Sequence, residues 1–145
     1  MKVLYDTSVL IPALLTKHEN HAIAFPQLQI AKREEVQGHL STHTLAELYS
    51  VTTRLPKPIG ISAESASEMV LDLLEYLVSV ELSAMDYRKA IARTTKQGLS
   101  GGVMYDAVIA QAALKAKVDR LITLNPKDFR RLGDDVSEIV YVPEG

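Results

Sequence analysis

The sequence predicts a single α/β domain, an α/β/α sandwich built on a central, mainly parallel sheet of about five strands. Short β-prone runs alternate with helical segments along the chain, which is the pattern of parallel strands joined by helical crossovers. The 145 residues also match the usual size of one domain. A chain of this length buries roughly two thirds of its unfolded surface, which is enough for a core. We therefore expect one domain over residues 1–145.

The first half of the chain opens with a β-prone run, 2–5, that ends at Asp6. Thr7 and Ser8 are suitable N-cap residues for a helix over 9–16. Further expected elements are a helix over 21–35, a strand over 38–41, a helix over 45–51 and a helix that opens at Ser62. This last helix carries apolar residues at helical spacing: Met69, Leu73, Leu74 and Leu77. We assign the face near Leu73, Leu74 and Leu77 to the core, with a dimer seam as the alternative.

The second half continues the alternation. A strand over 78–82 precedes a helix that starts at Ser83 or Ala84 and runs to about Lys96. Gly101 and Gly102 break the chain before a helix over 104–117, which is apolar on most sides and is therefore expected to be buried. The last expected elements are a strand over 120–124, a short helix over 128–132 and a strand over 138–142.

Composition excludes several classes of protein. Hydrophobic residues make up 47% and charged residues 23%, which is typical of globular domains and not of disordered or collagen-like chains. Cysteine is absent, which excludes disulfides, thiolate metal sites and thiol catalysis. No apolar run approaches the ~20 residues of a membrane span, so we expect a cytoplasmic protein without a membrane partner. The net charge of −2 means that any nucleic-acid contact must be local.

Polar side chains gather where the expected strands end. In an open parallel sheet, functional groups lie beyond the carboxyl ends of the strands. Asp6 ends the first strand, Glu47 lies one turn into the helix after the second, and Asp106 lies in the first turn of the buried helix. Asn125 and Asp128 follow the fourth strand. We therefore expect three or four acids to converge at one edge of the sheet.

Such a cluster of acids is typical of a metal site. Carboxylates a few Å apart raise one another's pKa, and a cation removes this penalty. Ligands that are all oxygen favour Mg²⁺ or Mn²⁺ over zinc. In enzymes these ions typically serve phosphodiester chemistry. No other residue set in the chain offers a nucleophile–base pair or a phosphate-binding loop.

Each acid also has a structural interpretation. Asp6 is placed to cap a helix, and Thr44-x-x-Glu47 fits a capping box. A carboxylate at the start of a helix, such as Asp106, stabilises that helix by about 0.3–1 kcal/mol through the helix dipole. Asp128 is consistent with a capping or surface residue. The joint placement of the four, and not any single one, favours a functional site.

Four segments, in this order, carry a resemblance to a known family. They are Val3-Leu4-Tyr5-Asp6-Thr7-Ser8-Val9-Leu10-Ile11, Leu45-Ala46-Glu47-Leu48-Tyr49, Tyr105-Asp106-Ala107-Val108-Ile109-Ala110 and Leu121-Ile122-Thr123-Leu124-Asn125-Pro126-Lys127-Asp128-Phe129. Together they make the chain resemble the PIN-domain family and, within it, the VapC-like ribonuclease toxins of type II toxin–antitoxin systems. The resemblance covers essentially the whole chain.

The resemblance implies an endoribonuclease that depends on Mg²⁺ or Mn²⁺ and hydrolyses RNA phosphodiester bonds. Asp6, Glu47 and Asp106 fall on the three principal metal-binding, catalytic acids of the family. Many members have a fourth acid where this chain has Asn125. This departure puts tight binding of a second metal ion in doubt, and Asp128 is the alternative metal ligand.

Other residues receive supporting roles from the resemblance and their placement. Thr7, Ser8, Thr123 and Asn125 are expected to orient carboxylates or waters. His43, one turn before Glu47, is within reach of a substrate, although ordinary packing is the simpler expectation. The helical pair His18 and His21 is read as a surface pair and not as a metal site. Candidate RNA contacts, each with a solvated helix face as its alternative, are Arg54, Lys57, Arg93, Lys127, Arg130 and Arg131.

The implied partners are RNA, a cognate antitoxin whose tail enters the acidic pocket, and a second copy of the chain in a homodimer. Two alternatives stay within the family: a PIN nuclease of RNA processing without a toxin role, and a degenerate PIN module that only binds RNA or protein. A receiver-like phospho-acceptor domain ranks last, because it expects paired acids after the first strand and Asp6 stands alone there.

Overall fold

The strands of the sheet are β1 (Lys2–Tyr5), β2 (Gln37–Ser41), β3 (Val78–Val80), β4 (Arg120–Ile122) and β5 (Val140–Tyr141). In the computed structural model, which describes residues 1–144, they pair in the order β3-β2-β1-β4-β5, and every pairing is parallel. The α/β/α prediction is therefore confirmed, with a sheet that is wholly parallel. Residue 145, the last of the expected domain, lies outside the described residues.

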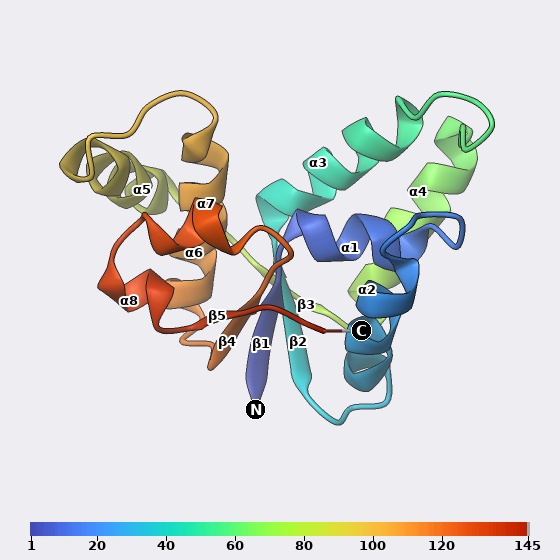
Figure 1. Cartoon of the computed structure of the whole chain (residues 1–145), viewed down its shortest axis with the longest axis horizontal. Helices are drawn as coiled ribbons and strands as arrows, with labels where there is room; N and C mark the ends of the chain where they lie inside the picture. The colour runs from blue at the N-terminus through green and yellow to red at the C-terminus, as the bar shows by residue number, and fades with distance from the viewer. Residues whose placement is uncertain (145) are drawn as a thin grey trace.

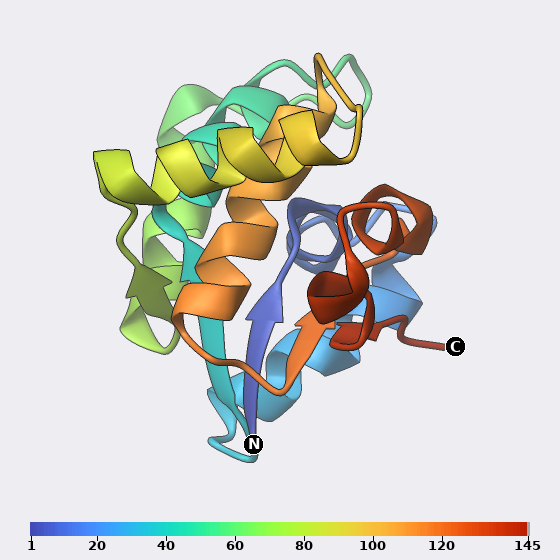
Figure 2. The same cartoon turned by 90° about the vertical axis from the view of Figure 1, so that its left-hand side faces the viewer.

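Helices cover both faces of this sheet (Figure 1). One layer contains α1 (Thr7–Leu14), α2 (His21–Lys32), α3 (Thr42–Thr53), α4 (Ala63–Asp72) and the 3₁₀ turn η1 (Leu73–Glu75). The other contains α5 (Ala84–Lys96), α6 (Val103–Lys115), α7 (Pro126–Arg130) and α8 (Asp134–Ser137). Figure 2 shows α5 lying across α6, on which it packs.

Alternate residues of the central strands supply two separate cores. Leu4 and Leu121 pack with the α5–α8 layer, whereas Val3, Tyr5 and Ile122 pack with the α1–α4 layer. This alternation follows from the two-residue period of a strand. As expected from its composition, α6 is buried on most sides.

Several element boundaries differ from those expected from the sequence. Strand β4 ends at Ile122, and the helix that follows it begins earlier, with Pro126 in its first turn, where the missing N–H costs nothing. The four-residue helix α8 has too few residues for a periodic pattern and was not expected. Leu73 and Leu77 are buried in the core, so the dimer-seam alternative is wrong for both. Leu74 is exposed, so its assignment to the core is wrong.

None of the helices in residues 1–144 combines the length and apolar character needed to cross a bilayer.

Gly38 lies in β2, where the surrounding side chains leave no room for a Cβ atom. A Cβ atom there would lie 2.6 Å from Leu77 Cδ2 and 3.0 Å from both Ala31 Cβ and Tyr5 Cε2. We predict that Gly38→Ala lowers the free energy of unfolding by about 1–3 kcal/mol through overpacking. Urea unfolding followed by circular dichroism measures this. Gly102→Ala is the matched control, because nothing lies within 4 Å of its Cβ position; equal stability of the two variants would contradict the prediction.

Candidate active site

The carboxyl edge of the sheet brings together side chains from distant segments. α1 starts directly after β1 and α3 directly after β2, and the start of α6 reaches the same edge (Figure 1). Asp6, Glu47 and Asp106 lie on these three segments. Their proximity is visible in the electrostatics, since the charges of Asp6 and Glu47 both raise the pKa of Asp106.

Asp6 is held by a network of hydroxyl groups. Its carboxylate is 4% exposed, and its Oδ2 accepts hydrogen bonds from Ser8 Oγ at 2.6 Å and Thr123 Oγ1 at 2.8 Å. Those two oxygens in turn accept from the backbone N–H groups of Leu124 and Asn125, both at 2.9 Å. Asp6 occupies the N-cap position of α1, yet its side chain makes no capping bond. The interpretation of Asp6 as a simple helix cap is therefore wrong.

Burial raises the pKa of the Asp6 carboxyl, and the hydroxyls of Ser8 and Thr123 offset part of that effect. The Asp6 carboxylate is thus fixed in position by hydrogen bonds from hydroxyl groups, and within residues 1–144 no Lys, Arg or His side chain forms an ion pair with it. A buried anion in this state gains from any cation that reaches it.

Glu47 lies inside α3 and does not serve as a cap. Helix α3 is capped by Ser41, whose Oγ accepts from the N–H of His43 at 3.2 Å, so the Thr44–Glu47 capping box is wrong. Burial, together with the charge of Asp6, raises the pKa of Glu47. In residues 1–144, Glu47 Oε2 and Thr7 Oγ1 are buried atoms without a hydrogen-bond partner. Both atoms are available to a ligand.

Asp106 lies in the first turn of α6 and has the most perturbed carboxyl of the site. Burial raises its pKa to about 7, and the charges of Asp6 and Asp128 contribute to the shift, which Arg131 partly offsets. Near neutral pH this group is poised between its two protonation states. Such a shift in a cluster of acids is typical of a functional site.

The fourth acidic position is shared by Asn125 and Asp128. Asn125 is the N-cap residue of α7, and its backbone N–H is bound to the hydroxyl of Thr123. The side chain of Asp128 is 43% exposed, and its Oδ1 lies 3.6 Å from Arg131 Nη2. The charge of Asp128 raises the pKa of Asp106. Both residues border the acids, and which of them completes the site stays a prediction.

The acids fit a divalent cation by their chemistry. They are hard oxygen ligands, their carboxyl pKa values are raised, and the buried Oε2 of Glu47 has no hydrogen-bond partner, its nearest basic group being His43 Nε2 at 4.0 Å. Within residues 1–144, however, no three His, Asp or Glu side chains already stand close enough to hold one ion. Mutual repulsion favours the separation of such carboxylates when no cation lies between them.

The candidate RNA contacts fall into two groups. Arg131 lies beside the acids, and Arg54 lines a cleft together with Glu47. Arg93 is engaged elsewhere, in a bidentate pair with Asp135 at 2.7 Å. Lys57 lies in the connection between α3 and α4, while Lys127 and Arg130 lie on α7. Arg93 therefore has a structural partner, and its role in RNA binding stays a prediction with the other five.

The pair His18 and His21 does not form a joint site. His18 Nδ1 accepts from the N–H of Asn20 at 3.0 Å, and His21 Nδ1 lies 2.8 Å from the carbonyl of Pro12. Each ring is thus committed locally, in agreement with the surface-pair interpretation.

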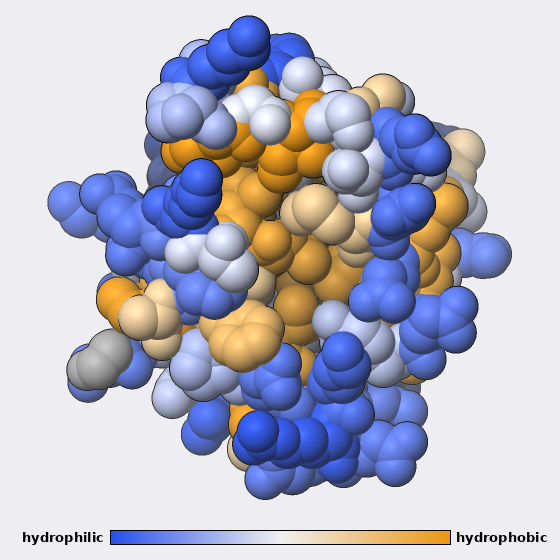
Figure 3. All heavy atoms as spheres, turned by 90° about the vertical axis from the view of Figure 1, so that its right-hand side faces the viewer, coloured by the Kyte–Doolittle hydropathy of each residue, from blue (hydrophilic) through white to orange (hydrophobic). Residues whose placement is uncertain are grey.

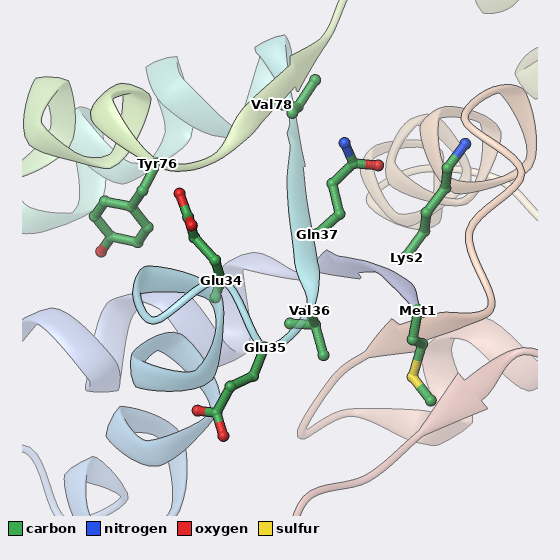
Figure 4. A pocket seen from close by; sticks show the side chains of 9 residues that line it. Met1, Lys2, Glu34, Glu35, Val36, Gln37, Tyr76 and Val78 are labelled. Carbon is green, nitrogen blue, oxygen red and sulfur yellow. The ribbon is translucent and has the colours of Figure 1, made fainter.

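A cavity at the amino end of the strands carries no comparable chemistry. It measures about 580 Å³ and is lined in part by Lys2, Glu34, Glu35 and Tyr76. Figure 4 shows Glu34 and Glu35 pointing in different directions, with Lys2 directed away from both. Its charged groups do not converge, so the acidic edge remains the candidate active site.

Sequence reasoning missed one feature of the site. The rings of His43 and Tyr105 stack, with centroids 5.4 Å apart and planes at 10°. The position of His43 four residues before Glu47 and that of Tyr105 directly before Asp106 were visible in the sequence. Their mutual contact depends on the crossing of α3 and α6, which no local pattern encodes.

The PIN-domain profile matches residues 3–135. The chain is a member of the PIN-domain family. It is 34% identical over 120 residues to ribonuclease VapC40 of Mycobacterium tuberculosis. The matched region covers 81% of this chain and 82% of the relative. The predicted resemblance to VapC-like PIN domains is thereby confirmed.

Two solved structures share the fold. VapBC2 from Rickettsia felis, bound to a promoter DNA fragment, matches with a TM-score of 0.70 at 22% identity, over 99% of this chain and all of that one. A toxin–antitoxin complex from Klebsiella pneumoniae matches with a TM-score of 0.60 at 20% identity, over 88% and 89% of the two chains. At these identities the matches support the PIN fold alone.

The raised pKa of Asp106 makes the stability of the metal-free PIN domain depend on pH. Between about 4, the ordinary value, and about 7, the folded chain holds a proton that the unfolded chain has released, so the free energy of unfolding falls as pH rises. We predict that Asp106→Asn removes this loss and makes the protein more stable at pH 7.5 by about 1–3 kcal/mol, after allowance for partial solvent screening.

Urea unfolding in EDTA at pH 5 and pH 7.5 measures the effect. Glu35→Gln, an exposed acid at the other end of the sheet, is the control and should follow the wild type. Parallel pH dependence in the wild type and Asp106→Asn would contradict the assignment.

Proposed function

We propose that this PIN domain is a metal-dependent endoribonuclease that acts as the toxin of a toxin–antitoxin pair. The observation that carries the proposal is the convergence of Asp6, Glu47 and Asp106, three buried or half-buried acids with raised pKa values, at the carboxyl edge of the sheet. VapC40, a relative at 34% identity, is a ribonuclease, which supports RNA as the substrate.

The three acids would hold a Mg²⁺ or Mn²⁺ ion, with Asp128 as a further ligand. When bound, such an ion orients the phosphate and lowers the pKa of a water that attacks it. The chain's own contribution is positional. Ser8 and Thr123 hold Asp6 in one orientation, while Asp106, whose carboxyl pKa is raised by burial and by the neighbouring acids, would release its proton to bind the ion.

An apolar face next to the site suits an antitoxin. Figure 3 shows apolar residues gathered in the middle of this face, with hydrophilic residues around them. A groove of about 280 Å³ between the end of α1 and α4 is lined by apolar residues, among them Ile59, Ile61 and Met69, and by the polar residues Thr16 and Lys17. Apolar surface of this kind marks a protein contact, and a fold neighbour is a toxin–antitoxin complex.

The groove and the acids lie at opposite ends of α1. Eight helical residues span about 12 Å, so a partner segment seated in the groove needs only a short extension along α1 to reach Asp6. Occupation of the acidic pocket by a cationic tail would then silence the nuclease. The expected homodimer is a separate proposal, which sedimentation of the purified chain would test.

Removal of one acid should abolish cleavage without unfolding the chain. We predict that the wild type degrades a mixed RNA pool with Mg²⁺ or Mn²⁺, that EDTA stops it, and that Asp6→Asn and Asp106→Asn are inactive. The amide keeps the shape of the carboxylate but removes the charge that a cation needs. Gel electrophoresis of the RNA, with circular dichroism of each variant, measures both activity and folding.

The control for this assay is Glu35→Gln, which keeps the site intact and should cleave like the wild type. Cleavage in EDTA, or full activity of a folded Asp6→Asn protein, would contradict the proposed site.

A toxin role predicts more than nuclease activity. Expression of the wild-type chain alone should arrest the growth of a bacterial host, and Asp6→Asn should relieve that arrest, because toxicity follows from RNA cleavage. Colony counts after induction measure this. Normal growth with an active nuclease would instead favour the PIN nuclease of RNA processing.

A further inference from the structure

The stacked rings of His43 and Tyr105 lie directly beside the acids. His43 belongs to the first turn of α3 and Tyr105 to the first turn of α6. Their centroids are 5.4 Å apart and their planes are within 10° of parallel. The pair therefore bridges the two helices that carry Glu47 and Asp106.

Tyr105 is too exposed for a ring whose only role is packing. Its exposed fraction is 57%, although it stacks on a neighbouring ring. A ring that served only to join two helices would gain most by complete removal from water. Much of Tyr105 instead remains available to a further aromatic or planar group.

The pair also forms one end of a cleft. The cleft measures about 410 Å³, within the range of sites for small ligands, and follows one face of α3, because its residues recur every three or four positions. The apolar residues of this face are Ala46 and Val51, and the polar ones are Glu47, Ser50 and Arg54. We call this site, lined by His43, Ser50, Arg54 and Tyr105, the aromatic cleft.

Arg54 gives the aromatic cleft a positive group. Its Nε donates to the carbonyl of Ser50 at 3.1 Å, which anchors the guanidinium. Within residues 1–144, no carboxylate lies within 4.0 Å of its nitrogen atoms. Seven helical residues separate it from Glu47, a distance of about 10 Å along α3. Arg54 can thus bind a phosphate near the acids without a competing ion pair.

We propose that the aromatic cleft binds one unpaired nucleotide of the RNA substrate, with its base stacked on Tyr105 and its phosphate bound to Arg54. The proposal rests on the endoribonuclease function proposed above and adds a specificity site to it. Single-stranded RNA fits this site because its bases can leave the stack and pack on aromatic rings. Paired bases in a duplex cannot do so.

The test is RNA binding without cleavage. Every protein carries Asp6→Asn to prevent hydrolysis, and the probes are fluorescein-labelled single-stranded RNA 10-mers, of mixed sequence or with 2-aminopurine at each position in turn. Anisotropy reports affinity, and quenching of 2-aminopurine reports stacking. We expect Tyr105→Ala to weaken binding about 5- to 100-fold, the usual effect of losing one stacked base, and to reduce the quenching.

Matched variants separate stacking from structure. Tyr105→Phe keeps a ring and should bind and quench like the parent, whereas Tyr105→Leu keeps apolar volume and should behave like Tyr105→Ala. Tyr49→Ala removes an exposed tyrosine of α3 that does not line the aromatic cleft and should leave binding unchanged. If Tyr105→Leu bound RNA and quenched 2-aminopurine as well as Tyr105→Phe does, an aromatic ring would not be needed and the proposal would be overturned. This comparison stays decisive even if Tyr105→Ala fails to fold.

Arg54 provides an independent measurement. If Arg54 binds one phosphate, Arg54→Ala should lower the slope of log K against log salt by about 0.7, the value for one contact with a single strand. Arg33→Ala, which removes an exposed arginine at the end of α2, should leave the slope unchanged. An unchanged slope in Arg54→Ala would overturn the assignment of Arg54 as the phosphate contact of the aromatic cleft.

The two proposals fail in different ways. If RNA binding depends on Tyr105 but the wild type cleaves no RNA with either metal ion, the proposed nucleotide site stands and the proposed nuclease activity is overturned. If cleavage requires the metal ion but RNA binding does not depend on Tyr105, the proposed nuclease activity stands and the proposed nucleotide site is overturned.

Discussion

The pairing of β1 with β4 is the constraint on which the rest of the site depends. The parallel register sets Tyr5 opposite Ile122, and the N–H of Asp6 continues the ladder with a 2.9 Å bond to the Ile122 carbonyl. One residue beyond the ladder on each strand, Asp6 meets Thr123 side chain to side chain. A slip of β1 by one residue would turn its side chains to the opposite face of the sheet and separate Asp6 from Thr123, so the register of the two strands fixes this contact.

Charge repulsion sets the second level of organisation. Asp6 is fixed by hydroxyl groups, whereas Glu47 and Asp106 come from helices that belong to different layers of the sandwich. The burial of α6 on most sides keeps Asp106 close to the other acids despite the repulsion. Packing energy thus maintains an arrangement of the three acids that electrostatic repulsion alone would open.

Much of this architecture was predictable from the sequence, because its signals are local. The alternation of strands and helices gave the fold class, and Asp6, Glu47 and Asp106 stand at positions where strands end or helices begin. The capping interpretations of Asp6 and Glu47 failed for physical reasons. The Asp6 carboxylate is bound by the hydroxyls of Ser8 and Thr123, and Ser41 caps α3 in place of the predicted Thr44–Glu47 box. The stack of His43 on Tyr105 depends on how α3 and α6 meet, so it required the structure.

Asn125 bears on the stability of the folded domain. It follows β4 at the N-cap position of α7 and is a neutral amide, whereas a carboxylate there would add to the repulsion among Asp6, Glu47 and Asp106. Each such charge lowers the stability of the folded state until a counter-charge arrives. The neutral amide at position 125 therefore spares the folded domain the repulsion of a fourth charge at this edge of the sheet.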